Sequence, residues 1–213
     1  MYVPATPQPA APLAPVGIAA TDPTIVTPVQ TELHARSYQL NVLAGHRASV
    51  TGTLLEDHRP APAGELVALQ TLGNHGWKTL VRARSGANGR FRLNYVPRQT
   101  GSRWARLRFA GNATELATHR RLGRLNVYRL AEASWYGGGG SLACGGSLTS
   151  STMGVANKTL PCGTIITLRY DGRTVRVPVV DRGPYVAGRE FDLTEATKNA
   201  LGFAGVGEVW STS

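Results

Sequence analysis

Apolar and polar residues alternate with a period of two through much of the segment 33–128. In residues 77–84 every second side chain falls on one face, and residues 104–109 repeat the pattern. Strict alternation predicts half-buried β-strands, because successive side chains of a strand point to opposite faces. Asn88-Gly89 lies between two such runs, as expected of a hairpin turn. About seven short strands of this kind predict a β-sandwich.

The second half of the chain continues as strands, with one helical stretch near its end. Residues 164–169 and 174–180 flank Asp171-Gly172, a strong signal for a two-residue hairpin. The stretch 193–201 has a helical pattern, and residues 206–210 read as a last strand. One small barrel with one short helix fits this order of elements.

Residues 1–32 differ from both halves, because proline, alanine and threonine dominate them. Such a segment lacks the apolar surface to fold and predicts an extended tether. We expect no transmembrane segment, since no stretch approaches the roughly 20 apolar residues needed to span a bilayer. The N-terminus, which begins Met1–Pro4, has neither a basic n-region nor an apolar h-region, so no signal peptide is visible. We divide the chain into a tether (1–32), a sandwich (33–128) and a barrel (129–213).

The formal net charge of +10 is concentrated in the sandwich. Residues 33–128 hold 15 Lys and Arg against 4 Asp and Glu, whereas residues 129–213 hold 8 against 7. The basic strands either meet a polyanion or are solvated faces whose charge prevents edge-to-edge aggregation. We expect no nucleic-acid partner, because no helix or basic motif is available to enter a groove.

The chain has two cysteines, Cys144 and Cys162. They predict a disulfide if the protein is exported and two small apolar residues if it is cytosolic. A zinc site usually takes four ligands, and all five histidines lie in the first half. We therefore expect no metal and no cofactor.

Four short segments of the second half stand in a fixed order. They are ASWYG (133–137), ANKTLPCGT (156–164), VDRGPY (180–185) and GREFDL (188–193). Together they resemble the rare lipoprotein A family over about residues 131–211. The resemblance implies a six-stranded double-psi β-barrel that is exported to the cell envelope, and some family members are lytic transglycosylases of peptide-free peptidoglycan strands. The first half resembles, less specifically, the Ig-like modules that accompany such barrels.

Cleavage of a glycosidic bond needs a proton donor, normally a carboxylic acid. In related barrels the aspartate matching Asp192 is the acid, and its neighbours Phe191 and Leu193 would shield the carboxyl from water. Alternatively, Asp192 caps the following helix, with Glu195 completing a capping box; Thr194 could cap instead.

Asp181 is the second catalytic candidate, and its alternative role is to stabilise a turn with Arg182. A lytic transglycosylase can use one carboxylate, because a hydroxyl of the sugar itself is the nucleophile. A hydrolase usually needs two carboxylates. The small number of carboxylates in the barrel therefore favours lytic cleavage.

Aromatic and polar residues of the motifs are the candidates for sugar binding. Trp135, Tyr136 and Tyr185 predict a stacking platform, with core packing as the alternative. Asn157, Thr159 and Arg182 are the expected polar contacts.

Two departures from the family pattern bear on activity. Asn157 stands where the family usually has histidine, and Gly146-Ser147 stands where a Gly-Glu segment is usual.

The motifs and the candidate acid together predict an exported protein that acts on peptidoglycan glycan strands as a lytic transglycosylase. The alternative is a non-catalytic, expansin-like or glycan-binding module. Anionic wall polymers are the expected partners of the basic sandwich, and a protease-inhibitor or other protein-interaction role is a further, less favoured alternative.

Overall fold

The computed structural model describes residues 27–213. These residues form an all-β fold with a single α-helix, as the alternation predicts. The strands are β1 (Thr31–Tyr38), β2 (Asn41–Leu43), β3 (Ala48–Glu56), β4 (Arg59–Pro60), β5 (Leu66–Gly73), β6 (Gly76–Arg84), β7 (Arg90–Tyr95), β8 (Gly101–Phe109), β9 (Thr118–Tyr136), β10 (Gly140–Ser141), β11 (Ser147–Leu148), β12 (Val155–Ala156), β13 (Ile165–Tyr170), β14 (Arg173–Asp181), β15 (Phe191–Thr194) and β16 (Gly207–Ser211). The helix α1 spans Glu195–Leu201. Within residues 27–213 no helix has the length and apolar character needed to cross a bilayer.

The N-terminal part consists of two sheets that share one core. In the first sheet β3 pairs with β1, β4 and β7, and in the second the order is β6-β5-β8-β9, with β2 on the other side of β9. Leu54 of β3, Leu69 of β5 and Leu107 of β8 belong to the same buried cluster. The two layers follow the predicted sandwich, whereas its classification as Ig-like stays a prediction.

Folded structure begins before the predicted end of the tether. The strand β1 starts at Thr31, and Val29 forms an isolated bridge with Glu115. The Val29 amide donates to the Thr114 carbonyl at 2.8 Å. The rest of the predicted tether, residues 1–26, lies outside the described residues.

The C-terminal part is a closed six-stranded barrel. Its strands follow one another as β15-β12-β14-β13-β16-β9, and β9 pairs again with β15 to close the ring. Inward side chains such as Leu168, Val177 and Phe191 form a second buried cluster. The predicted hairpin turn at Asp171-Gly172 joins β13 to β14, and both of its residues have positive φ, 42° and 79°.

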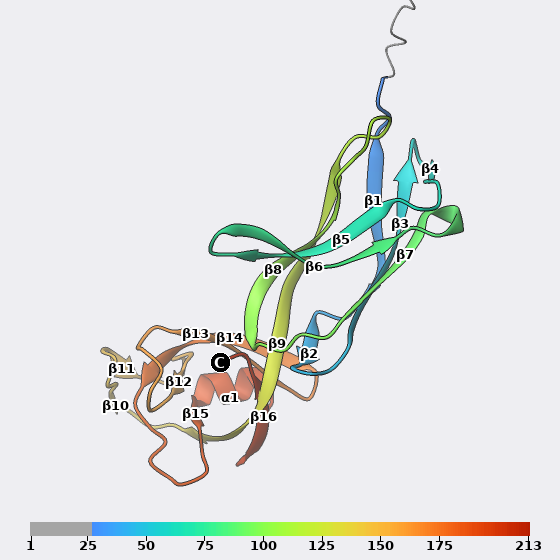
Figure 1. Cartoon of the computed structure of the whole chain (residues 1–213). Helices are drawn as coiled ribbons and strands as arrows, with labels where there is room; N and C mark the ends of the chain where they lie inside the picture. The colour runs from blue at the N-terminus through green and yellow to red at the C-terminus, as the bar shows by residue number, and fades with distance from the viewer. Residues whose placement is uncertain (1–26) are drawn as a thin grey trace, which may run out of the picture.

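A single strand, β9, belongs to both parts (Figure 1). Its residues 118–127 pair with β8, and residues 129–136 pair first with β16 and then with β15. The predicted boundary at residue 129 therefore lies inside a continuous strand and not in a linker. Figure 1 shows β9 leaving the N-terminal sheets and entering the barrel.

The helix α1 is capped by Thr194, whose hydroxyl accepts a hydrogen bond from the Thr197 amide at 3.4 Å. The hydroxyls of Thr194 and Thr197 also donate to the Gly154 carbonyl, at 3.1 and 2.9 Å respectively. At the other end Gly202 adopts the left-handed conformation typical of a helix terminus. The alternative that Asp192 caps the helix is therefore wrong, because Asp192 lies within β15, two residues before the cap.

The predicted disulfide between Cys144 and Cys162 is confirmed, with 5.5 Å between the two Cα atoms. The Cys144 amide also donates to the Val180 carbonyl at 3.2 Å. These bonds fasten the segment that carries β10 and β11 to the wall of the barrel.

We predict that the double variant Cys144→Ser/Cys162→Ser loses about 3 kcal/mol of unfolding free energy, because the reduced chain regains the entropy of a loop closed over 18 residues. Urea unfolding measures this loss. A reductant should lower the stability of the wild-type protein and leave the double variant unchanged. An equal response of both proteins would contradict the prediction.

We also predict that Gly154→Ala destabilises the protein by about 1–3 kcal/mol, because overpacking forces neighbouring groups apart. A Cβ at this position would lie 2.5 Å from Cγ2 of Val180. Gly139→Ala is the matched control, since a Cβ there meets nothing within 4 Å. Thermal or urea unfolding of both variants separates local crowding from a general effect of replacing glycine.

Candidate active site on the barrel

Three polar residues and one alanine form a row across four neighbouring strands of the barrel. Ala156 of β12 is the register partner of Asp181 on β14 and of Asp192 on β15. Asp192 is in turn the register partner of Ser134 on β9. The two aspartates are thus separated by two strand spacings, which corresponds to roughly 10 Å between their Cα atoms. The small side chain of Ala156 lies between them.

Asp192 is half-buried and hydrogen-bonded to its neighbour in the row. The Ser134 hydroxyl donates to its Oδ1, and the Arg189 guanidinium donates to the Ser134 hydroxyl at 3.3 Å. Phe191 and Leu193 belong to the barrel core, on the face opposite to the carboxylate. The expectation that these two neighbours shield the carboxyl is therefore wrong. The polar neighbours of the Asp192 carboxyl group are Ser134, which binds it directly, and Arg189, which binds Ser134.

Asp181 is bound mainly by backbone amides. Its Oδ1 accepts hydrogen bonds from the amides of Ala143 and Arg182, both at 2.8 Å. The first of these bonds joins the end of β14 to the disulfide-bonded segment. This geometry favours the turn-stabilising role that the sequence left open for Asp181.

The Tyr136 side chain reaches toward both aspartates. Its hydroxyl is buried and has no hydrogen-bond partner among residues 27–213. Burial raises the pKa of Tyr136 above the usual 10, and the negative charges of Asp181 and Asp192 raise it further. The tyrosine therefore stays neutral at physiological pH.

A hollow of about 480 Å³ lies beside this row. It is lined by Arg129, Asn157, Lys158, Thr159, Leu160, Gly188, Arg189, Glu190 and Ser213. Arg189 belongs to both places, since it lines the hollow and also contacts Ser134 next to Asp192. Within residues 27–213 neither Lys158 nor Arg189 has a carboxylate within 4 Å, so both cations face the hollow unneutralised.

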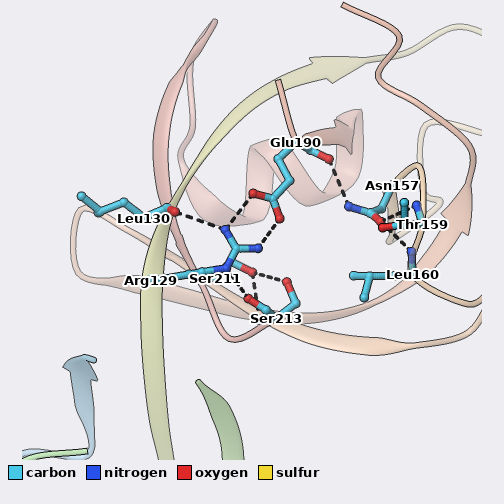
Figure 2. Close-up of polar contacts among 8 residues, drawn as sticks. All are labelled: Arg129, Leu130, Asn157, Thr159, Leu160, Glu190, Ser211 and Ser213. Atoms are coloured by element: carbon cyan, nitrogen blue, oxygen red, sulfur yellow. Dashed lines mark hydrogen bonds and ion pairs between the residues drawn. The ribbon is translucent and has the colours of Figure 1, made fainter. Parts of the chain in front are cut away.

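Two of the residues that line the hollow, Arg129 and Glu190, form an ion pair (Figure 2). Arg129 donates two hydrogen bonds to the Glu190 carboxylate, one of them at 2.7 Å from Nη1 to Oε2. Its Nε also donates to the Ser213 carbonyl at 2.6 Å. The bonds to Glu190 raise the pKa of Arg129. The pair fixes the end of the loop between β14 and β15, two residues before Asp192.

The Asn157 side chain is buried and forms hydrogen bonds with the backbone. The residue is only 4% exposed, and its Oδ1 accepts from the amides of Thr159 and Leu160 at 3.0 and 2.8 Å. Its Nδ2 donates to the Glu190 carbonyl at 3.1 Å, as Figure 2 shows. In this turn the Asn157 side-chain amide uses most of its hydrogen-bonding capacity on backbone groups. Asn157 therefore shapes the rim of the hollow, and Thr159 is exposed on that rim.

Arg182 also binds the backbone of this turn. Its Nη1 donates to the carbonyls of Asn157 and Leu160 at 3.1 and 3.0 Å, and its Nη2 lies 3.1 Å from the Cys162 sulfur. These contacts occupy both terminal nitrogens of the Arg182 guanidinium with groups of the protein itself. The geometry favours a positioning role over direct sugar contact.

The three candidate aromatic residues differ in exposure. Tyr185, on the loop between β14 and β15, is 82% exposed. Trp135 is 40% exposed, and the Lys198 ammonium lies 4.3 Å from its ring centroid. Neither residue belongs to the buried cluster of the barrel. Both rings are therefore available at the surface, whereas Tyr136 is partly covered.

Sequence reasoning singled out neither Ser134 nor Arg189, although both lie within the quoted motifs. Strand periodicity contained the signal for Ser134, because it falls on the same face of β9 as Tyr136. The Arg129–Glu190 pair joins residues 61 positions apart and has no local signal.

We predict that Tyr136→Phe raises the unfolding free energy by about 1 kcal/mol at neutral pH, because it removes a buried hydroxyl without a partner. Above about pH 10 the difference should widen. The wild-type unfolded chain ionises there, while the raised pKa keeps the folded tyrosine neutral. Urea unfolding at pH 7 and pH 10.5 measures both effects. The exposed Tyr185→Phe is the control, and equal behaviour of the two variants would contradict the assignment.

Comparison with known proteins agrees with this architecture. Residues 130–210 match the family described as lytic transglycolase. Proteins named "Probable endolytic peptidoglycan transglycosylase RlpA" are 44% identical over 75 residues in Aquifex aeolicus and 39% identical over 84 residues in Synechocystis. These alignments cover 33% and 36% of this chain.

The chain spans only 33% and 26% of the length of those two relatives. Among solved structures, a Streptomyces papain inhibitor aligns with 28% identity and a TM-score of 0.35, over 40% of this chain and 92% of the inhibitor. Taken together, the closed six-stranded barrel, the ordered motifs and the match over residues 130–210 show that this part of the chain is similar to the lytic transglycolase family in fold and in sequence.

Proposed function

We propose that the barrel cleaves peptidoglycan glycan strands by lytic transglycosylation, with Asp192 as the acid and base. The observation that carries this proposal is the position of Asp192. It lies half-buried on β15 and free of the helix cap, and its partner Ser134 is contacted by Arg189, which also lines the hollow. The relatives named as peptidoglycan transglycosylases support the choice of substrate.

The proposed reaction needs only one carboxyl group. The protonated Asp192 gives its proton to the glycosidic oxygen as the bond to the anomeric carbon breaks. A hydroxyl of the same sugar then attacks that carbon and returns its proton to the carboxylate, which yields an anhydro sugar and regenerates the acid. Ser134 orients the carboxyl group through its hydrogen bond, and the neutral Tyr136 adds no charge beside it.

Surface residues around this position would hold the strand. Thr159 lies on the rim of the hollow, and the exposed rings of Trp135 and Tyr185 offer apolar faces for sugar stacking. Asp181 is a second candidate for catalysis, but its two backbone contacts favour a role in holding the loop. This assignment places the protein outside the cytoplasm, in the cell envelope, where its disulfide is stable. Anionic polymers of the wall would then be the partners of the basic N-terminal part.

A specific observation favours the alternative, a non-catalytic glycan-binding or expansin-like module. Asn157 stands at the family's histidine position, and its amide is committed to the backbone of a turn. An asparagine cannot transfer a proton near neutral pH. In this alternative the barrel binds glycan strands and leaves them intact.

We predict that the protein releases products with anhydro-sugar ends from peptide-free glycan strands, measured by mass spectrometry. Asp192→Asn should lower the rate at least about 100-fold, the usual contribution of a general acid. The matched control is Asp171→Asn, which makes the same chemical change at the exposed hairpin turn and should leave the rate unchanged.

Two results would contradict the proposal. Full activity of Asp192→Asn would remove Asp192 as the acid. Absence of any product, together with retained co-sedimentation of the protein with cell-wall sacculi, would establish the non-catalytic alternative.

A further inference from the structure

The outer face of the sheet β6-β5-β8-β9 carries a dense group of cations, here called the basic face. Core residues Val67, Leu69 and Leu107 point inward from β5 and β8, so their strand neighbours point outward. The outward cations are Arg82, Arg84, Arg106, Arg108, His119, Arg121 and Arg124. Figure 1 shows these four strands running side by side in the N-terminal part.

The cations are arranged in a way that costs stability. Arg106 and Arg121 are direct register partners on β8 and β9, and like charges directly opposite each other repel. Partial burial and the neighbouring charge of Arg108 lower the pKa of Arg106. Within residues 27–213 no carboxylate lies within ion-pair distance of any of these arginines. Arg106 donates a hydrogen bond to the neutral Gln70 amide at 2.9 Å, so its positive charge is not cancelled within the sheet. A cluster of cations without carboxylate partners attracts an external anion.

One part of the basic face is hollowed between two arginines. Ala68 of β5 is the register partner of Arg82 on β6 and of Arg108 on β8. Because Ala68 has only a methyl group, the two longer side chains border a depression of about 260 Å³. Glu65 also lines this depression and shares a hydrogen bond with Asn112 at 3.3 Å. An anion above Ala68 could be contacted from both sides by guanidinium groups.

Two other arginines of the face lie over tryptophan rings. The Arg106 guanidinium lies 4.0 Å from the ring centroid of Trp77, and that of Arg124 lies 4.6 Å from the ring centroid of Trp104. Such stacking fixes the side chains before a ligand binds. Trp77 is partly buried, whereas Trp104 is 48% exposed and carries Arg124 over its ring. The two guanidinium groups are therefore already in place for an anion.

The rows of cations have a regular spacing along the strands. Arg108 and Arg106 are two residues apart on β8, as are His119 and Arg121 on β9, which corresponds to about 7 Å. Phosphodiesters separated by a short polyol unit can repeat at this interval, whereas a polysaccharide with one carboxylate per disaccharide repeats its charge at a wider one. We propose that the basic face binds a linear polyol phosphate, with one phosphate held above Ala68 between Arg82 and Arg108. This site does not depend on the proposed activity of the barrel.

The test measures binding of fluorescently labelled poly(glycerol phosphate) to the full chain by anisotropy, at low and at physiological salt. Arg82→Gln/Arg108→Gln should weaken binding at least about 10-fold and reduce the dependence of log Kd on log salt concentration by roughly 1.5. The matched control is Arg90→Gln/Arg92→Gln, which removes the same charge from exposed positions on β7 in the opposite sheet and should change Kd less than about threefold. Thermal melting of both variants confirms folding.

Three results would overturn the proposal. The first is no binding by the wild-type protein. The second is an equal loss of affinity in both double variants, which would mean that net charge and not this face attracts the polymer. The third is equally tight binding of single-stranded DNA, or of a carboxylated polysaccharide, with the same sensitivity to Arg82→Gln/Arg108→Gln.

Discussion

The hydrogen-bond ladder of β9 is the constraint on which the rest of the structure depends. One half of this strand satisfies its backbone groups with β8 and β2, and the other half with β16 and β15. The change of partners occurs at Tyr128, which is fully buried, donates from its hydroxyl to Asn41 at 2.7 Å and lies 5.7 Å from the ring of Trp210. Bending the chain at this point would break main-chain hydrogen bonds and expose the Tyr128 ring. The sandwich and the barrel are therefore joined without a flexible hinge.

This rigid connection has a functional consequence, because β9 contributes to both proposed sites. Arg121 and Arg124 lie on the basic face, and Ser134 and Tyr136 lie beside the barrel aspartates. A polymer bound to the basic face would fix the orientation of the barrel relative to the surrounding wall. Binding and cleavage would then be coupled by geometry alone, with no conformational change in either part.

The candidate active site depends on the closure of the barrel. Asp192 meets Ser134 only because β15 pairs with β9, the last pairing that closes the ring. The loop before Asp192 is held at its end by the Arg129–Glu190 pair, and Asp181 is held by the amide of the next residue, Arg182, and by that of Ala143 in the disulfide-bonded segment. Hydrogen bonds to the backbone thus hold most of the polar motif residues. Asp192, the exposed rings and the cations of the hollow are left to face a ligand.

The sequence by itself determined the elements whose signals are local. Period-two alternation gave the strands, Asp171-Gly172 the hairpin, residues 193–201 the helix to within two residues of its start, and the four ordered motifs the barrel family. Tertiary structure alone decided the rest, because it depends on pairing between distant strands. The periodicity of β9 does not reveal that the strand crosses from one part to the other. The competition between Asp192 and Thr194 for the helix cap was settled only by the fold, in which Gly154 offers its carbonyl to the Thr194 hydroxyl and pairing with β9 and β12 keeps Asp192 in a strand.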